Sequence, residues 1–404
     1  MQLKRLATLA LAAAVLSGCA TQPMAATHKA RPAIAVEMGG KVNLRTAQIQ
    51  LQNDGKARHV AATAEFPYTL TNVAQVPPVT VGGETVQASD IVISDDGNTA
   101  VIAHNLAGDK WAGGIQVLDI HDPTAPRVIQ QIKFPSMDVN ALALQGTTLY
   151  FAGAADPDRW YFKSYVGKFD ITNPTSGQIG DSLRGLRSHA ATSLSLSKGS
   201  LYVGVGARDG GVEKLDASTM AGTGFTALDD VRGLAVGAAG TFALAGTTDG
   251  TATEGRLKLL GAGDAGINLG DFASAYAKAT IEVNADGLAA LALSKKGLEL
   301  RDSGTGALKF ALDNPSDSEK EATNGATMDN DLVFTANGGY GFRVLQVLDR
   351  TATGDAFAHV VGRHELAGAA YQGQTYSANM VRYRAGHLFV ATGVGGVNVY
   401  RCTR

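Results

Sequence analysis

Cysteine, tryptophan and charged side chains are all scarce in this chain of 404 residues. Cysteine occurs twice, at Cys19 and Cys402, and 18% of the residues are charged. Two cysteines cannot build a disulfide framework, so stability has to come from one large hydrophobic core or several small ones. We expect the Cys402 thiol, two residues from the C-terminus, to be half-buried and unreactive.

Motifs of metal and nucleophile chemistry are missing as well, and no catalytic residue is assigned. The eight histidines show no metal-ligand spacing, and neither an H-E-x-x-H motif nor a G-x-S-x-G elbow occurs. The formal net charge is −2 and no stretch is strongly basic, which excludes nucleic acid as a partner. After residue 19, every apolar run is far shorter than the ~20 residues of a membrane-spanning helix.

The first nineteen residues have the pattern of an export signal. Lys4 and Arg5 precede an apolar run from Leu6 to Leu16, and small residues lead to Cys19. A basic start, an apolar stretch of this length and a small-residue cleavage site are typical of a secretory signal. An ordinary secretory signal with a cysteine near the cleavage site is the alternative.

The segment Leu16–Cys19 (LSGC) resembles the lipobox of bacterial lipoproteins. The resemblance implies that Cys19 is lipidated and that the mature protein is lipid-anchored in the bacterial cell envelope. Since Ala20 rather than aspartate follows the cysteine, it implies the outer membrane in preference to the inner one. We therefore divide the chain into a signal peptide (1–18), a lipidated N-terminus and tether or arm (19–56) and a folded domain (57–404). Within the arm, Val42–Leu51 fits an additional edge strand or an ordered arm equally well.

Glycine is abundant, at 49 residues, and it marks an internal repeat. Seven times, a short apolar strand is followed by a second strand that begins with glycine. One glycine from each unit gives the series Gly114, Gly167, Gly211, Gly255, Gly297, Gly341 and Gly396. The separations are 53, 44, 44, 42, 44 and 55 residues, which match the ~40–50 residues of a four-stranded propeller blade.

The sequence therefore predicts an all-β fold, a seven-bladed β-propeller of four-stranded antiparallel blades, with six or eight blades as alternatives. A pair of β-sandwiches would not repeat at this period, and the coils of a β-solenoid are shorter. The chain ends after the third strand of the seventh unit, so we expect the N-terminal strand His59–Phe66 to join the last blade and close the ring. An outer strand of the second unit is predicted at Gln178–Leu183.

Two units carry a more specific motif. Gly114–Arg127 reads GIQVLDIHDPTAPR and Gly167–Pro174 reads GKFDITNP. These segments resemble the repeat of LVIVD-type propellers, in which a strand ends in Asp-Ile and is followed by an Asx-Pro turn. The other five units keep the strands and lose this turn motif. The resemblance implies an extracytoplasmic, surface-associated propeller and no single chemistry.

Strand direction alternates within a blade, so the loops between second and third strands emerge on the same face as the loops between blades. The two longest second-to-third loops, in blades one and two, are rich in aromatic and charged residues, as is the last inter-blade loop. Aromatic residues and arginine on exposed loops are typical of an interaction surface. The candidate ligand- or partner-binding residues are Lys110, Trp111, Arg159, Trp160, Tyr161, Tyr165, Tyr371 and Tyr376.

Two classes of function fit this pattern. The first is a membrane-anchored binding or scaffold protein whose loop face engages an envelope protein, a polysaccharide or an extracellular ligand. The second is a hydrolase or lyase of the lactonase or phytase type, with a metal in the central funnel. Asp156 and Asp158 are weak candidates for a cation site, with Ca²⁺ the possible cofactor, although such a pair is more often a solvated turn.

Overall fold

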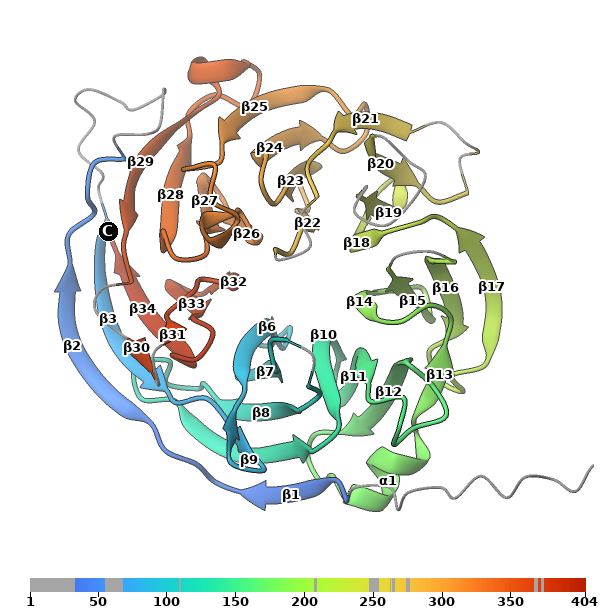
Figure 1. Ribbon diagram of the computed structural model, residues 1–404. Helices are drawn as coiled ribbons and strands as arrows, with labels where there is room; N and C mark the ends of the chain where they lie inside the picture. Colours follow the sequence, from blue (N-terminus) through green and yellow to red (C-terminus); the bar gives the residue numbers. More distant parts are fainter. Residues whose placement is uncertain are drawn as a thin grey trace, which may run out of the picture.

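The computed structural model describes residues 33–54, 68–108, 110–206, 209–246, 254–261, 263, 266–273, 277–366, 370–371 and 374–404. In this part of the chain, antiparallel sheets are arranged around a central axis (Figure 1). The expectation of a seven-bladed β-propeller is confirmed, since seven sheets contain the four strands of a blade. Among the described residues, no helix has the length and apolar composition needed to cross a membrane.

In each of the first three blades, the strands follow chain order from the inner strand to the outer strand. Blade 1 consists of β6 (Gln87–Ile93), β7 (Thr99–Asn105), β8 (Gly113–Asp119) and β9 (Arg127–Phe134). Blade 2 consists of β10 (Met137–Gln145), β11 (Thr148–Ala155), β12 (Ser164–Asp170) and β13 (Arg184–Leu186). Blade 3 consists of β14 (Ala191–Ser197), β15 (Ser200–Val205), β16 (Gly211–Asp216) and β17 (Gly222–Ala227).

Blades 4 to 6 repeat this order. Blade 4 consists of β18 (Val231–Gly237), β19 (Gly240–Ala245), β20 (Gly255–Leu259) and β21 (Gly266–Gly270). Blade 5 consists of β22 (Thr280–Val283), β23 (Leu288–Ala292), β24 (Gly297–Asp302) and β25 (Leu308–Asp313). Blade 6 consists of β26 (Gly325–Asp329), β27 (Leu332–Ala336), β28 (Phe342–Val347) and β29 (Ala358–His364).

Blade 7 joins the two ends of the described chain. Its inner strands are β32 (Met380–Arg384), β33 (His387–Ala391) and β34 (Val397–Thr403), and its outer strand is β3 (Thr69–Val76), antiparallel to β34 with Leu70 opposite Cys402. Closure by an N-terminal strand is thus confirmed, but the predicted position was wrong. The strand begins at Thr69, and His59–Phe66 lies outside the described residues.

The segment before β3 adds a strap across the seam of the ring (Figure 1). We define the strap as residues 34–54. Its strand β1 (Ala35–Met38) pairs with β9 of blade 1, and β2 (Asn43–Ile49) pairs with β3 of blade 7, which decides for an edge strand at 42–51. Farther on, Gln52 bridges to Arg363 of blade 6. The strap therefore ties three consecutive blades together on either side of the closure.

A buried ion pair ends the strap. The Asp54 carboxylate lies 2.5 Å from the Arg343 guanidinium, and both side chains are almost completely inaccessible to solvent. The hydroxyl of Tyr340 donates to the other Asp54 oxygen at 2.8 Å. Because an unpaired buried charge is costly, this pair makes the position of the strap on blade 6 specific.

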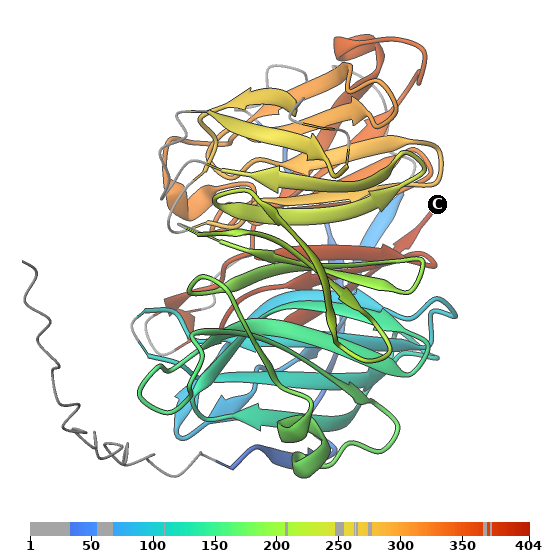
Figure 2. The same ribbon diagram turned by 90° about the vertical axis from the view of Figure 1, so that its right-hand side faces the viewer.

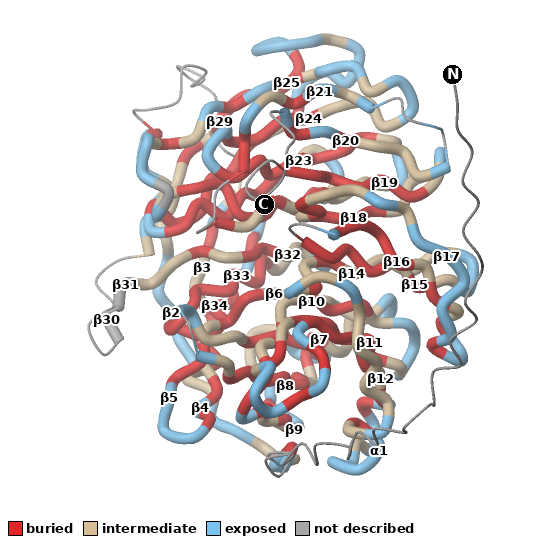
Figure 3. Tube along the Cα trace, turned by 45° about the vertical axis from the view of Figure 1, so that its right-hand side comes forward, coloured by how far each residue is buried: buried red, intermediate tan, exposed pale blue. Residues whose placement is uncertain are grey.

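Hydrophobic clusters between neighbouring blades form the core, and exposed positions concentrate in outer strands such as β17 and β2 (Figure 3). Near the axis, polar groups link successive blades. Six side chains at matching positions of the inner strands bond into the next blade; they are Ser89, Asn140, Thr192, Arg232, Asn324 and Asn379. At the seventh step, the backbone amide of Lys278 donates to Asn324 at 3.1 Å. The inner strands are therefore joined in a complete circle.

One predicted outer strand is a helix. Gln178–Leu183 falls mostly on α1 (Ser176–Asp181), and the short β13 follows it. The Thr175 side chain accepts from the Gln178 amide at 3.3 Å as an N-cap, and Ile179 is buried in the core beside blade 1. Figure 2 shows α1 on the rim of the ring close to β1.

The remaining short elements are two 3₁₀ turns, Glu319–Glu321 and Gly354–Ala356, and the hairpins β4–β5 (Thr80–Val81, Glu84–Thr85) and β30–β31 (Ala370–Tyr371, Gln374–Thr375).

Candidate interaction face

The two long loops of blades 1 and 2 that the sequence predicts as an interaction surface emerge on the same face. Register places Gln87, the first residue of β6, opposite Asn105, the last residue of β7, so the 106–112 loop lies where β6 begins. Blade 2 follows the same rule, with Met137 opposite Ala155 and the 156–163 loop beyond them. We call the outward part of these two loops the loop face, defined by the exposed Lys110, Arg159, Tyr161 and Lys163 together with the half-buried Trp111.

Two residues at the start of β10 connect the loops. One oxygen of the Asp138 carboxyl accepts the amides of Leu106 and Ala112, at 3.0 and 3.3 Å, and so clamps both ends of the 106–112 loop. The backbone carbonyl of the same residue accepts the Tyr165 hydroxyl at 2.7 Å. Ser136 accepts the indole NH of Trp160 at 2.8 Å. The 135–138 turn thus fixes both loops against each other.

Side chains of the 156–163 loop alternate between inside and outside. Trp160 and Phe162 are buried, with only 7% of each accessible, and their rings stack at 5.3 Å. Arg159, Tyr161 and Lys163 are exposed. Tyr161 leaves 69% of its surface accessible while its ring meets Phe162 edge-on at 4.8 Å. Two buried aromatic anchors therefore hold a loop that presents a tyrosine between two cations.

Of the candidate binding residues, Trp160 and Tyr165 do not face solvent. Tyr165 is completely buried and belongs, with Trp160, to the hydrophobic cluster between blades 1 and 2. Close packing behind these rings also explains why residue 153 is a glycine. A Cβ on Gly153 would lie 1.9 Å from the Asp138 carbonyl oxygen, so no larger residue fits there. Both aromatic residues support the loop face from below instead of forming its surface.

The remaining candidates lie on or beside the loop face. Lys110 is exposed and pairs with Glu84 of the β4–β5 hairpin at 2.8 Å, and Trp111 is half-buried. Tyr376, in the last inter-blade loop, is half-buried, lies over Gly395 and accepts a bond from Gln75 at 3.4 Å. Tyr371 belongs to β30, and its side chain lies outside the described part of the chain.

Asp156 and Asp158 form a turn. An oxygen of the Asp156 carboxyl accepts the amide of Asp158 at 2.9 Å, which is the Asx-type bond of a solvated turn. Within the described residues, no group of three or more histidine, cysteine, aspartate or glutamate side chains is placed to hold a metal ion.

The electrostatics of the loop face centre on Asp138. Burial raises the pKa of its carboxyl to about 7, against the opposing effect of the two amides that it accepts. The nearby negative charge and burial in turn raise the pKa of the Tyr165 hydroxyl well above its ordinary value, with burial the larger cause. The clamp on the 106–112 loop is therefore held by a carboxyl that changes protonation near neutral pH.

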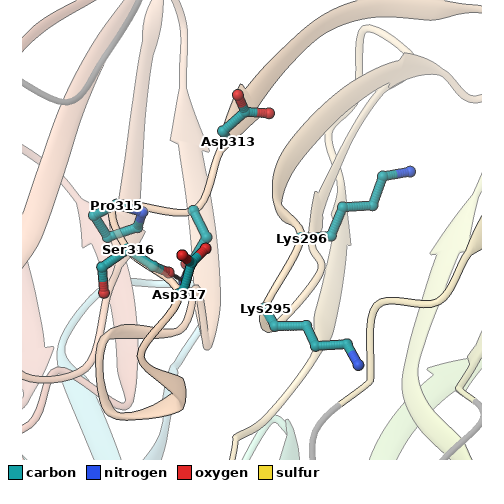
Figure 4. A pocket seen from close by; sticks show the side chains of 7 residues that line it. Lys295, Lys296, Asp313, Pro315, Ser316 and Asp317 are labelled. Atoms are coloured by element: carbon teal, nitrogen blue, oxygen red, sulfur yellow. Dashed lines mark hydrogen bonds between the residues drawn. The ribbon is translucent and has the colours of Figure 1, made fainter.

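A cavity of about 580 Å³ lies between Lys295–Lys296 of blade 5 and residues 313–317, where the chain leaves that blade toward blade 6. Figure 4 shows its two lysines pointing away from Asp313 and Asp317. Lys295 pairs with Asp271 at 2.8 Å, and Lys296 pairs with Glu299 at 2.7 Å. With its cations neutralised by other partners, this open hollow presents no convergent set of groups.

Sequence reasoning missed Ser136 and Asp138. Ser136 directly precedes the inner strand β10, and Asp138 is the second residue of that strand. Polar residues also occur at the start of inner strands in other blades, so nothing in the local pattern distinguishes these two. The next loop reads RWYFK at Arg159–Lys163, three consecutive aromatic residues between two cations. That composition marks the loop, but only the structure distinguishes the anchors, Trp160 and Phe162, from the displayed Tyr161.

Comparisons with known proteins bear on the fold alone. No family model matches the chain, and no curated protein matches it. Among solved structures, U3-55K has a TM-score of 0.55 at 10% identity, covering 80% of this chain and 99% of that one. The WD40 repeats of RRP9 give 0.55 at 10% identity (81% and 99%), and the WD40 β-propeller domain of Doa1 gives 0.51 at 12% (83% and 97%). In fold, then, this chain is a seven-bladed β-propeller similar to WD40 propellers.

Proposed function

We propose that the chain is a lipid-anchored binding protein of the bacterial cell envelope, and that its loop face engages an envelope protein or a polysaccharide. One observation carries the proposal. Tyr161 is 69% exposed, yet its ring packs edge-on against the buried Phe162, which in turn stacks on the buried Trp160, and Arg159 and Lys163 lie on either side. An aromatic side chain fixed in advance loses little conformational entropy on binding, which is why tyrosine and arginine dominate binding hot spots.

Anchoring rests on the sequence. The LSGC segment at Leu16–Cys19 resembles a lipobox, and the Asp-Ile/Asx-Pro repeats of blades 1 and 2 resemble those of LVIVD-type surface propellers. Both resemblances support a location outside the cytoplasm, with the outer membrane preferred. Replacement of Cys19 by serine in the expressing bacterium should abolish labelling by an alkyne fatty acid and release the protein from the membrane fraction. Undiminished labelling of the C19S variant would refute the anchor.

Partner binding is tested by comparing faces. Tyr161→Ala and Arg159→Ala should each reduce the partner recovered from detergent-solubilised envelopes by about tenfold, the size of a modest hot-spot loss. Leu348 is the matched control. It is 52% exposed in the loop between β28 and β29, which emerges on the opposite face. Recovery that is equal for wild type, Y161A and L348A would show that the loop face does not bind.

A further inference from the structure

A second cavity opens where the central channel meets the face opposite the loop face. It has a volume of about 280 Å³ and is lined by residues from blades 1, 2, 5, 6 and 7. Its blade 1 contribution, Val92–Asp95, comes from the end of β6, whereas the loop face lies at the start of that strand. We call this hollow the channel-mouth cavity.

Lys278 separates the channel-mouth cavity from the loop face. Lys278 lies just before β22 of blade 5. Its ammonium group donates to the Ser89 carbonyl of blade 1 at 2.7 Å and to the Asn140 carbonyl of blade 2 at 3.2 Å. The side chain thus spans the channel and bridges three blades. The cavity lies at the ends of the inner strands, on the face opposite the loops, so its occupancy is independent of the proposed function of the loops.

An ion pair with spare bonding capacity lies in the wall. Glu282 and Arg382 are 3.3 Å apart and each leaves 26% of its side chain accessible. One oxygen of Glu282 is fixed by the Met328 amide at 2.9 Å and the Thr327 hydroxyl at 3.2 Å. Among the described residues, the other oxygen contacts the Arg382 guanidinium at 3.3 Å, which is longer than the ~2.7–2.9 Å of a normal charge-assisted bond. That oxygen retains capacity for a cationic donor.

The rest of the lining restricts the ligand. Val92, Ile93, Leu144 and Met328 supply the apolar part of a lining whose other residues are polar or charged. The charged residues that line the cavity are Asp95, Glu282, Arg382 and Arg384, two of each sign, so a ligand with a net charge would stay uncompensated in a partly desolvated site. Small-molecule sites usually span ~300–1,000 Å³, and this cavity is at the lower limit. A small zwitterion with an apolar body satisfies all three conditions.

We propose that the channel-mouth cavity binds a free α-amino acid with an apolar side chain. Its carboxylate pairs with Arg382, its ammonium group pairs with Glu282, and its side chain packs on the apolar part of the lining. Burial raises the pKa of Glu282, and the positive charge of Arg382 opposes that effect. An arriving ammonium group favours the ionised carboxylate in the same way, so binding stabilises the charged form.

Calorimetric titration of the full chain with L-leucine, isocaproate and isopentylamine tests this site. Leucine should bind with a Kd below about 1 mM, and each analogue, which lacks one charged group, should bind about tenfold more weakly or worse. Glu282→Gln and Arg382→Gln should each weaken leucine binding at least as much, and Arg127→Gln, an exposed arginine outside the cavity lining, should not. Absence of saturable leucine binding, or equal binding of leucine and isocaproate, overturns the proposal.

A measurement on the unmodified protein covers the case in which the variants fail to fold. Irradiation with photo-leucine, followed by peptide mapping, should label segments that line the cavity, namely 92–95, 327–328 or 382–384. Labelling at other segments only, or no labelling that excess leucine suppresses, overturns the proposal as well.

Discussion

Replacement of Asp138 by asparagine should make the protein more stable at alkaline pH and leave it almost unchanged at acidic pH. The folded-state pKa of this carboxyl is about 7, against 3.8 for the free side chain, and burial is the main cause. Between those values the folded chain holds a proton that the unfolded chain releases. Stability therefore falls as the pH rises from about 4 to about 7 and is constant above that range.

The structure sets the size of the effect. One pKa unit corresponds to about 1.4 kcal/mol, so forcing the ionised carboxylate into this site costs at most about 4 kcal/mol of folding free energy. Asparagine has the shape of the protonated acid, and its amide oxygen can accept the Leu106 and Ala112 amides that Asp138 accepts now. The variant should retain the clamp and lose the penalty.

Urea unfolding at pH 4.5 and pH 8.5 measures this difference. The midpoint of Asp138→Asn should exceed the wild type slightly at the lower pH, where about a quarter of the penalty is present, and far more at the higher pH. Asp119→Asn is the control, because a hydrogen bond from Arg127 lowers the pKa of Asp119 to about 2, and its effect should not change between those two pH values. A D138N effect that is equal at both pH values would refute the assignment of a buried, proton-holding carboxyl.

Three further comparisons between variants test the packing and the buried charged groups. Trp160→Ala should cost about 3–5 kcal/mol of unfolding free energy because its ring is buried, whereas Tyr161→Ala should stay within about 0.5 kcal/mol; equal losses in urea would contradict the division into anchor and displayed residue. Asp54→Ala should cost about 3–5 kcal/mol by stranding the buried Arg343 charge, and the added change Arg343→Met should recover part of it. No recovery in the double variant would refute the ion-pair explanation. Lys278→Met should lower the free energy of unfolding by about 2 kcal/mol, because the bonds across the channel are lost. Lys295→Met, which removes a lysine from an exposed ion pair, should leave that free energy almost unchanged.

The fold was largely predictable because each blade repeats the same backbone demands. The glycine series placed seven units, one for each blade of the ring. The closing strand was misplaced by ten residues because HVAATAEF and TLTNVAQV alternate in the same way, and only the pairing with β34 distinguishes them. Likewise, Gln178–Leu183 is too short for periodicity to separate a strand from a single capped helical turn.

Turn chemistry was more widespread than the sequence motif indicated. Blades 3, 5 and 6 lack the Asx-Pro dipeptide, yet Asp216, Asp302 and Asp349 each accept the amide of a threonine two or three residues later. In blade 2, Asp170 caps the turn in the same manner. The aspartate that ends the third strand therefore does the capping, and proline is an addition to it.

The candidate site was predictable only in outline. Its loops were identified correctly as neighbours on one face, because that follows from strand alternation. The burial of Trp160 and Tyr165 could not be predicted, since an aromatic residue in a loop serves equally well as an anchor or as a contact residue. The role of Asp138 depends on two loops that approach it from different blades, and tertiary contacts of that kind leave no local signature.

Site-specific photocross-linking tests the central claim most directly. A benzoylphenylalanine residue placed at Tyr161 in the intact bacterium should form a discrete cross-linked adduct with an envelope component, and the same residue at Leu348 should not. Adducts that are absent at Tyr161, or that are identical at the two positions, would contradict a binding role for the loop face.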